Sequence, residues 1–161
     1  GSTSLKTAVI EDRASLPNYV FDKCISLEEI YVPGSVTTVT DHAFHGCHSV
    51  KTLTFGEGVK KIESTAALNS FSIEKITIPK SVTEIGEYAL GYYYYHPNYV
   101  PFTPTFYVYN NTAGLEYAKK NGFDYVIIDS PPSLSLLTVN GMISVPSANS
   151  PSSSLIRVKR F

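Results

Sequence analysis

The sequence predicts an α+β fold that is mostly β: a solenoid of stacked parallel strands, closed by a short helix and a final strand. Three observations predict it. Apolar residues recur every 23 positions between residues 26 and 90, each period holds one short strand pattern, and the period stops ahead of a helix signal. A fixed period of this length is typical of repeat arrays, whose units bury their apolar faces only against neighbouring units.

Six columns of apolar residues carry the period, and the members of each column lie 23 positions apart. They are Leu27, Val50 and Ile73; Ile30, Leu53 and Ile76; Val32, Phe55 and Ile78; Val36, Val59 and Val82; Val39, Ile62 and Ile85; and Ala43, Ala66 and Ala89. The leader of each unit alternates apolar and polar residues, as a half-buried strand does, until a Pro or Gly ends it. Strands about 4.8 Å apart would stack these columns into continuous ladders.

Two units, SLEEIYVPGSVTTVTDHAFHGC and SIEKITIPKSVTEIGEYAL, resemble the BspA-like class of leucine-rich repeats, whose pattern is roughly LxxIxIPxSVxxIGxxAFxxC. That class is found chiefly in secreted and surface proteins of host-associated bacteria and some protozoa. The resemblance implies a leucine-rich-repeat solenoid, an extracellular or cell-surface location, and a recognition surface whose partner differs from protein to protein.

The pattern divides the chain into a solenoid with its cap at residues 1–129 and an extension at residues 130–161. Within the solenoid the units lie near residues 4–25, 26–48, 49–71 and 72–104, and the cap covers residues 105–129. The first unit is degenerate because one residue is missing inside it. Terminal units of an array are expected to be atypical, since one of their faces has no neighbouring unit.

The cap begins with an alternating strand pattern from Thr105 to Tyr109. Asn111 or Thr112 can then cap a short helix, and Asn121-Gly122 supplies its exit. The segment Tyr117-Ala-Lys-Lys-Asn-Gly122 resembles the YAxxNG ending of BspA-like arrays, and residues 123–129 predict the closing strand. The extension is rich in Ser and Pro, so we interpret it as a linker or a partly ordered segment, with a hairpin pattern around Asn140-Gly141.

Two features of the predicted core leave alternatives open. Cys24 and Cys47 share one repeat position, about 5 Å apart on adjacent strands, a separation that permits a disulfide. Parallel side-chain vectors disfavour the torsion of such a bridge, so the pattern favours two buried thiols. Ala67 stands at the position of Phe44, and either Leu68 or Phe71 must refill the lost volume.

Several functional classes lack support in the sequence. The net charge of −1 provides no field for nucleic acid, and no apolar run approaches the roughly 20 residues that a membrane helix needs. No nucleophile and base pattern or phosphate-binding loop occurs, so we expect neither an enzyme nor a cofactor. His42, His45 and His48 beside Cys47 suggest a metal, but the unit turns Cys47 inward and leaves the histidines as solvated loop residues.

Two surfaces are candidates for binding. Outward strand positions stack into two rows on the sheet face: Thr7, Glu29, Thr52 and Lys75, and Val9, Tyr31, Thr54, Thr77 and Tyr107. The second surface is the tyrosine-rich segment at residues 92–102, which interrupts the last regular unit. Large rigid tyrosine rings with polar tips are favoured in recognition surfaces. The predicted site residues are Tyr31 and Tyr107 on the sheet face, and Tyr93, Tyr94, Tyr95 and Tyr99 in the segment.

The function that we predict is a non-catalytic recognition or adhesion module that binds a protein partner of host or cell-wall origin. The first alternative is a carbohydrate-binding module, because tyrosine rings also stack on sugars. The second alternative is a rigid structural spacer inside a larger surface protein. Each surface also has a plain structural explanation: the sheet face as ordinary solvated surface, and the tyrosines as a cover for the open edge of the last unit.

Overall fold

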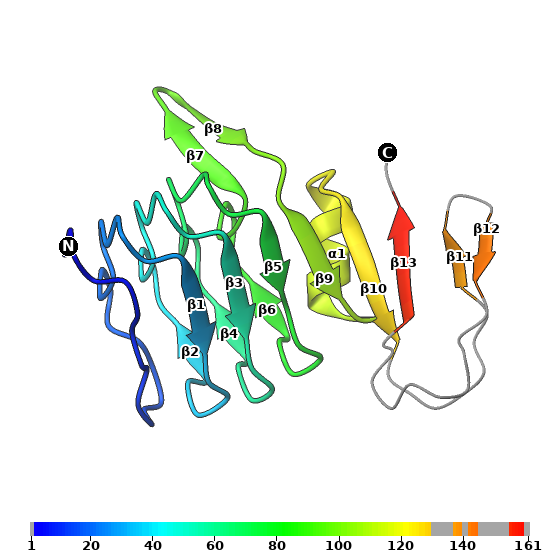
Figure 1. The fold of residues 1–161 in the computed structure, drawn as a ribbon, viewed down its shortest axis with the longest axis horizontal. Helices are drawn as coiled ribbons and strands as arrows, with labels where there is room; N and C mark the ends of the chain where they lie inside the picture. Colours follow the sequence, from blue (N-terminus) through cyan, green and yellow to red (C-terminus); the bar gives the residue numbers. More distant parts are fainter. Residues whose placement is uncertain (1, 130–136, 140–141, 145–154, 160–161) are drawn as a thin grey trace.

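The computed structural model describes residues 2–129, 137–139, 142–144 and 155–159. Figure 1 shows the chain winding into a solenoid, with the strands of successive units side by side. This confirms the predicted mostly-β fold with parallel strands, and the described residues contain one short helix.

The main sheet contains one strand from each of the three regular units, two from the cap and one from the extension. Its order is β1 (Glu29–Val32), β3 (Thr52–Phe55), β5 (Lys75–Thr77), β9 (Thr105–Val108), β10 (Tyr125–Asp129) and β13 (Leu155–Lys159). All neighbours pair in parallel except β10 and β13, which are antiparallel. Ile30 pairs with Leu53, Leu53 with Ile76, and Ile76 with Phe106, so the 23-residue columns are ladders in the folded chain.

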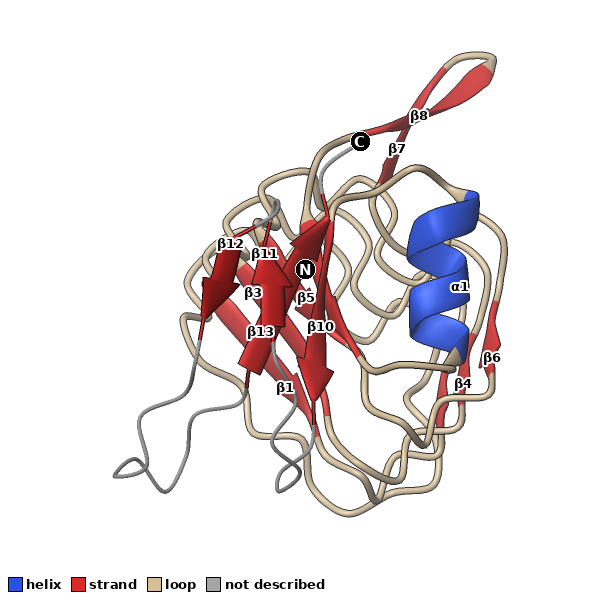
Figure 2. Ribbon diagram, turned by 90° about the vertical axis from the view of Figure 1, so that its right-hand side faces the viewer, coloured by secondary structure: helices blue, strands red, loops and turns tan. Residues whose placement is uncertain are grey.

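A second parallel sheet lies on the other side of the core. Its strands are β2 (Thr38–Val39), β4 (Lys61–Ile62) and β6 (Glu84–Ile85), which pair in that order. Figure 2 shows the main sheet on one side of the molecule, and β4, β6 and the helix on the other. The solenoid interior between them is filled by the predicted columns, and Val36, Val39, Leu53 and Ile62 are fully buried.

Turns form the third side of the solenoid, and each contains residues with left-handed backbone. Tyr19, His42, Thr65 and Tyr88 lie 23 positions apart and have φ angles of 59°, 56°, 55° and 53°. This conformation costs non-glycine residues about 1–2 kcal/mol each. Hydrogen bonds between successive turns oppose the cost, as when the Phe44 amide donates to the Ala66 carbonyl at 2.8 Å and the Ala67 amide to the Ala89 carbonyl at 2.9 Å.

The core settles two of the open alternatives. Cys24 and Cys47 are both buried and free, which confirms the interpretation as two thiols. Leu68 is buried beside Ala67, whereas Phe71 is 51% exposed and packs against the ring of His48 at 4.8 Å. Leu68 therefore refills the volume that the Ala67 position lacks, and the Phe71 alternative was wrong.

The first unit is the least regular. No strand forms among residues 2–14, although the predicted inward residues Leu5, Ala8 and Ile10 do pack against the core. Between them Val9 is 90% exposed. The unit joins the array by a parallel bridge between Ser15 and Thr38 and through its turn, where the Phe21 amide donates to the Ala43 carbonyl at 2.9 Å.

At the other end of the array, the tyrosine-rich segment forms a hairpin of β7 (Tyr92–Tyr95) and β8 (Asn98–Pro101). Helix α1 (Ala113–Lys120) then begins after Thr112, whose hydroxyl accepts a hydrogen bond from the Leu115 amide at 3.3 Å. This confirms Thr112 as the cap, and Leu115 and Ala118 are buried on one face as expected. Among the residues that the structure describes, no helix has the length and apolar character needed to cross a membrane.

The extension contributes three short strands. β11 (Leu137–Val139) and β12 (Met142–Ser144) form the antiparallel pair that the hairpin pattern predicted, and its turn, Asn140-Gly141, lies outside the described residues. β13 adds to the edge of the main sheet beside β10. The division of the chain at residue 129 and the linker interpretation of the remaining extension stay predictions.

Candidate recognition surfaces

Both predicted sheet-face rows exist as paired residues from β1 onward, but their first members, Thr7 and Val9, lie outside any strand. Tyr31 pairs with Thr54, Thr54 with Thr77, and Thr77 with Tyr107 across four neighbouring strands. Tyr31 is 60% exposed, whereas Tyr107 is half-buried and lies under the Lys75 ammonium group, 4.4 Å from its ring centre. The row therefore has tyrosine rings at Tyr31 and Tyr107 with small threonines between them, and the sheet continues past Tyr107 to Val126 of β10.

The hairpin tyrosines divide into inward and outward rings. Tyr92 is buried, and its hydroxyl donates to the Asn121 side chain at 2.8 Å. Tyr93 is half-buried. Tyr94, Tyr95 and Tyr99 are 42%, 72% and 39% exposed, on a hairpin that projects beyond the solenoid in Figures 1 and 2.

One residue that the sequence analysis did not select, Tyr88, fastens the hairpin to the solenoid. Its ring stacks on Tyr99 with centroids 4.1 Å apart and 8° between the planes, and it meets Tyr92 edge-on at 5.1 Å. Tyr94 then lies 5.2 Å from Tyr99. The tyrosines thus both cover the last unit, through Tyr92, and leave rings exposed, through Tyr94 and Tyr95.

The predicted site residues form two separate groups. Tyr31 and Tyr107 lie on the main sheet, and the exposed hairpin rings lie beside the turns. Among the described residues, the ring contacts of Tyr94 and Tyr99 are with Tyr88, His96 and each other, and none is with Tyr31 or Tyr107. A partner that used both groups would have to reach around the edge of the solenoid.

A cluster of polar and aromatic residues, which we call the turn cluster, occupies the turns below the hairpin. Its members are Tyr19, Asp22, Asp41, His42, His45, Thr65 and Asn69. Tyr19 stacks on the His42 ring at 4.8 Å, and the two histidine rings are 5.3 Å apart. His42 Nδ1 lies 2.7 Å from the Asp41 carboxylate, and His45 Nδ1 lies 2.6 Å from that of Asp22.

Hydrogen bonds set the charge state of both carboxylates. The bond from His45 is the largest influence on Asp22 and lowers its pKa against the opposing effect of partial burial. At Asp41, partial burial acts to raise the pKa, but hydrogen bonds from Thr65 and His42 outweigh it and the pKa is lowered. Both aspartates are therefore acceptors for a neighbouring histidine rather than proton donors.

The histidines differ from their prediction as solvated loop residues. His48 is exposed, but the side chains of His42 and His45 are only 21% and 20% exposed because each is held by an aspartate. Within the described part of the chain, no three His, Cys, Asp or Glu side chains are placed to share a metal ion. The cluster is a hydrogen-bonded network that joins adjacent turns.

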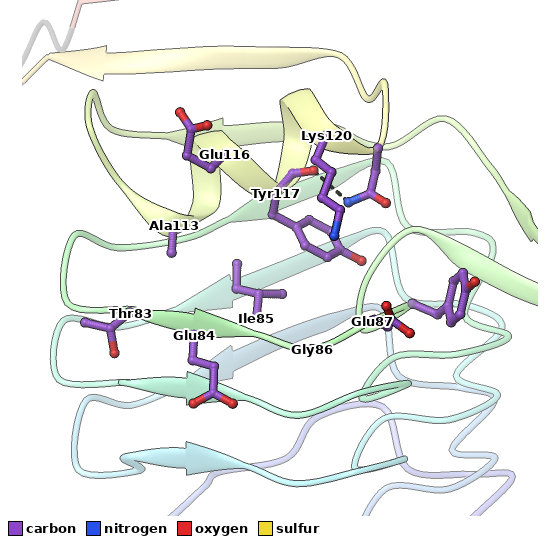
Figure 3. Close-up of a pocket in the computed structure, with 11 residues that line it drawn as sticks. Thr83, Glu84, Ile85, Gly86, Glu87, Ala113, Glu116, Tyr117 and Lys120 are labelled. Carbon is purple, nitrogen blue, oxygen red and sulfur yellow. Dashed lines mark hydrogen bonds between the residues drawn. The ribbon is translucent and has the colours of Figure 1, made fainter.

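A groove of about 520 Å³ lies between β6 and α1. Figure 3 shows Thr83, Glu84 and Ile85 along one wall and Glu116 and Lys120 along the helix wall. Tyr117 lies between the walls, where burial raises its pKa well above the ordinary value. Its hydroxyl donates to the Leu90 carbonyl at 2.8 Å and accepts from the Leu90 amide at 3.1 Å, so this group supports the fold.

A signal for the turn cluster and for Tyr88 was present in the sequence. Tyr19, His42, Thr65 and Tyr88 lie 23 residues apart, and a fixed period places such residues in one column. This column contains polar residues as well as tyrosines, so its pattern does not indicate a buried core position.

Comparisons with known proteins agree with this architecture. No curated protein and no solved structure matches the chain. The family model of the BspA type leucine rich repeat region matches residues 14–111 in six copies. Repeats of this kind are commonly protein-interaction modules, are generally not catalytic, and are typically surface or secreted in bacteria. Given the match and the ladders of 23-residue columns, the chain belongs to the BspA-type leucine-rich repeat family.

Proposed function

We propose that this chain is a non-catalytic recognition or adhesion module of an extracellular or cell-surface protein, and that it binds a protein partner mainly through the β7–β8 hairpin. The observation that carries the proposal is the exposure of Tyr94, Tyr95 and Tyr99 on a hairpin held beyond the core. Exposed aromatic rings with polar tips give large contact area for little conformational entropy.

The attachment of the hairpin supports this role. A two-stranded hairpin is marginally stable on its own, but here Tyr88 stacks on Tyr99 and the Asn69 side chain accepts a hydrogen bond from the Tyr94 amide at 2.7 Å. These contacts order the tyrosines before a partner arrives, which reduces the entropy lost on binding. The sheet-face pair Tyr31 and Tyr107 is the second surface, about 14 Å across three strand spacings.

Binding to a panel of host extracellular-matrix proteins and purified bacterial cell-wall proteins tests the proposal. Hot-spot aromatic residues typically contribute 2 kcal/mol or more, so for any panel protein that binds, the double variant Tyr94→Ala with Tyr95→Ala should weaken binding by about thirtyfold or more. Phe71→Ala is the matched control, because it removes an exposed ring from another turn. Unchanged affinity in the double variant would exclude the hairpin as the binding surface.

The sheet face is tested separately by Tyr31→Ala with Tyr107→Ala. A loss confined to this pair would move the site from the hairpin to the main sheet. If no panel protein binds the chain, the result favours the alternative of a structural spacer.

Carbohydrate binding is the second candidate function, and the 72% exposure of Tyr95 favours it, because an open ring face can stack on a sugar. A glycan array distinguishes the two. A lectin-like module should give a glycan signal that disappears in Tyr93→Ala, Tyr94→Ala and Tyr95→Ala variants. A protein-directed module should give none.

A further inference from the structure

Four groups form a continuous hydrogen-bonded chain from the first unit to the hairpin. The Asp22 carboxylate lies 2.6 Å from His45 Nδ1, His45 Nε2 lies 3.0 Å from the Asn69 side-chain nitrogen, and the Asn69 side-chain oxygen lies 2.7 Å from the Tyr94 amide nitrogen. The members belong to three successive turns and to β7. This chain is therefore a direct polar link between the solenoid and the exposed tyrosines.

The positions of the protons follow from the hairpin end of the chain. A backbone amide can only donate, so Asn69 must turn its oxygen to Tyr94 and its NH₂ group to His45. The NH₂ group also only donates, so His45 Nε2 must accept with a lone pair. The ring proton is then on Nδ1, facing Asp22. The complete network therefore contains a neutral His45.

We infer that His45 is a proton-sensitive latch, and that its protonation breaks the hydrogen bond that holds the Tyr94 backbone of the β7–β8 hairpin to the solenoid. A protonated Nε2–H would point at the Asn69 NH₂ group, a contact of two donors. Rotation of the Asn69 amide by half a turn would satisfy His45, but it would place NH₂ against the Tyr94 amide. A hydrogen bond from a charged imidazolium is the stronger of the two, so Asn69 turns its oxygen to His45 and the Tyr94 amide loses its acceptor.

The charged and titratable groups around His45 determine where the network breaks. Asp22 faces Nδ1 and stabilises the imidazolium, so the ring stays attached to the first unit. His42 lies 5.3 Å away with Asp41 bonded to it, Tyr19 lies at 6.4 Å, and Lys23 donates its amide to the His45 carbonyl. On the hairpin side the titratable neighbours are the Tyr94 side chain itself and His96, 6.2 Å from it. No carboxylate among the described groups replaces the acceptor there, so the hydrogen bond that is lost is the one between Asn69 and the Tyr94 amide.

Other contacts keep the base of the hairpin in place. The Asn69 amide donates to the Tyr92 carbonyl at 3.1 Å, the Phe102 amide donates to the Gly91 carbonyl at 2.9 Å, and Tyr92 bonds Asn121. Release is thus local to the outer rings of Tyr94 and Tyr95. Insofar as these rings bind the partner, which rests on the proposed function, binding should weaken as pH falls.

Hydrogen exchange read by NMR on the full chain tests the latch without a partner. As the pH is lowered and the His45 ring takes up a proton, the protection factor of the Tyr94 amide should fall about tenfold, the equivalent of one hydrogen bond. The fall should follow the titration of the His45 ring signals. Amides of β3 should keep their protection. A Tyr94 amide that is equally protected with His45 neutral and charged would overturn the inference.

Asn69→Asp is the decisive variant. A carboxylate there accepts from the Tyr94 amide and from a protonated His45 at once, so protection of Tyr94 should hold or rise as pH falls. Asp also tolerates the left-handed φ of 64° at this position. His45→Gln should abolish the response. If the protection factor of the Tyr94 amide falls in both variants as it does in the wild type, the latch is overturned. Failure of partner binding alone would count only against the proposed function.

Discussion

The ring of Phe44 stacks on the ring of Phe21, with centroids 5.7 Å apart and 15° between the planes. Phe44 is fully buried and Phe21 is half-buried. Because residues 2–14 form no strand, this stack adds to the turn hydrogen bonds, the Ser15–Thr38 bridge and the buried Leu16 in attaching the first unit to the array. The volume of Phe44 therefore supports two units at once.

Phe44→Ala should lower the free energy of unfolding by about 3–5 kcal/mol, through lost burial and the cavity that remains. Chemical denaturation measures the change. Phe71→Ala is the control, because Phe71 is 51% exposed and should change stability by no more than about 0.5 kcal/mol. A loss below about 1 kcal/mol for Phe44→Ala would show that its cavity collapses or that the ring is not in the core.

Two glycines should respond differently to alanine. Gly58 has a φ of 119°, and an added Cβ would lie 2.2 Å from the Gly34 carbonyl oxygen, so Gly58→Ala should cost about 3 kcal/mol or more. Gly122 has a φ of 72° and nothing within 4 Å of the added atom, so Gly122→Ala should cost about 1–2 kcal/mol, from backbone strain alone. Thermal unfolding of both variants should rank them in this order, and equal losses would contradict the close contact.

Ser70 should be more important to stability than Ser81, a half-buried serine that makes the same two kinds of hydrogen bond. Each hydroxyl accepts from a backbone amide and donates to a backbone carbonyl: Ser70 bonds Cys47 and Phe44, and Ser81 bonds Gly58 and Val59. Ser70 is fully buried, so Ser70→Ala strands two polar groups and should cost about 1–3 kcal/mol.

Ser81 is only half-buried, and water can replace its hydroxyl in Ser81→Ala. That loss should stay near 1 kcal/mol or less. Urea unfolding of the pair tests burial as the deciding factor. If Ser70→Ala and Ser81→Ala lower the free energy of unfolding by the same amount, burial is not the deciding factor.

The buried Cys47 thiol should make the fold sensitive to alkali. Burial raises its pKa to about 12, whereas an unfolded thiol ionises near pH 8.5. Below that pH both states are protonated and stability is unaffected. Above it the unfolded state loses the proton first, so stability should fall by about 1.4 kcal/mol per pH unit until the folded thiol ionises.

The difference in urea midpoint between the wild type and Cys47→Ala isolates this contribution, since Tyr117, whose pKa is also raised, titrates in both. The urea midpoint of the wild type should approach that of Cys47→Ala steadily from about pH 9 upward, because only the wild type has the Cys47 thiol to ionise. A constant difference would mean that the folded thiol ionises as readily as the unfolded one.

The ladders of the core followed from the period alone. A parallel array repeats the same local burial at every step, so residues such as Ile30, Leu53 and Ile76 must face one another if the units stack at all. The sequence left open how the missing volume at Ala67 is filled, because Leu68 and Phe71 both had the size. The turn geometry, which buries Leu68 and exposes Phe71, decided between them.

The hairpin was not predicted as a hairpin. Four consecutive tyrosines from Tyr92 to Tyr95 show no alternation of apolar and polar residues, although in β7 one ring is buried and others are exposed. The pattern indicated an interruption and a set of candidate rings. Only the fold showed that Tyr88 lies against Tyr99, and that the sheet-face tyrosines belong to a separate surface.

By itself the sequence determined the solenoid, its strand register, its inward columns, the helical cap and its family, because each depends on a period that every unit repeats. Tertiary structure decided the turn network, from Asp22 through His45 and Asn69 to Tyr94. The physical reason is that hydrogen bonding depends on which donor meets which acceptor in space. Asp22 and His45 are one 23-residue step apart, but Asn69 lies one residue beyond the next step and Tyr94 belongs to a hairpin that does not repeat, so the period alone does not show that these groups meet.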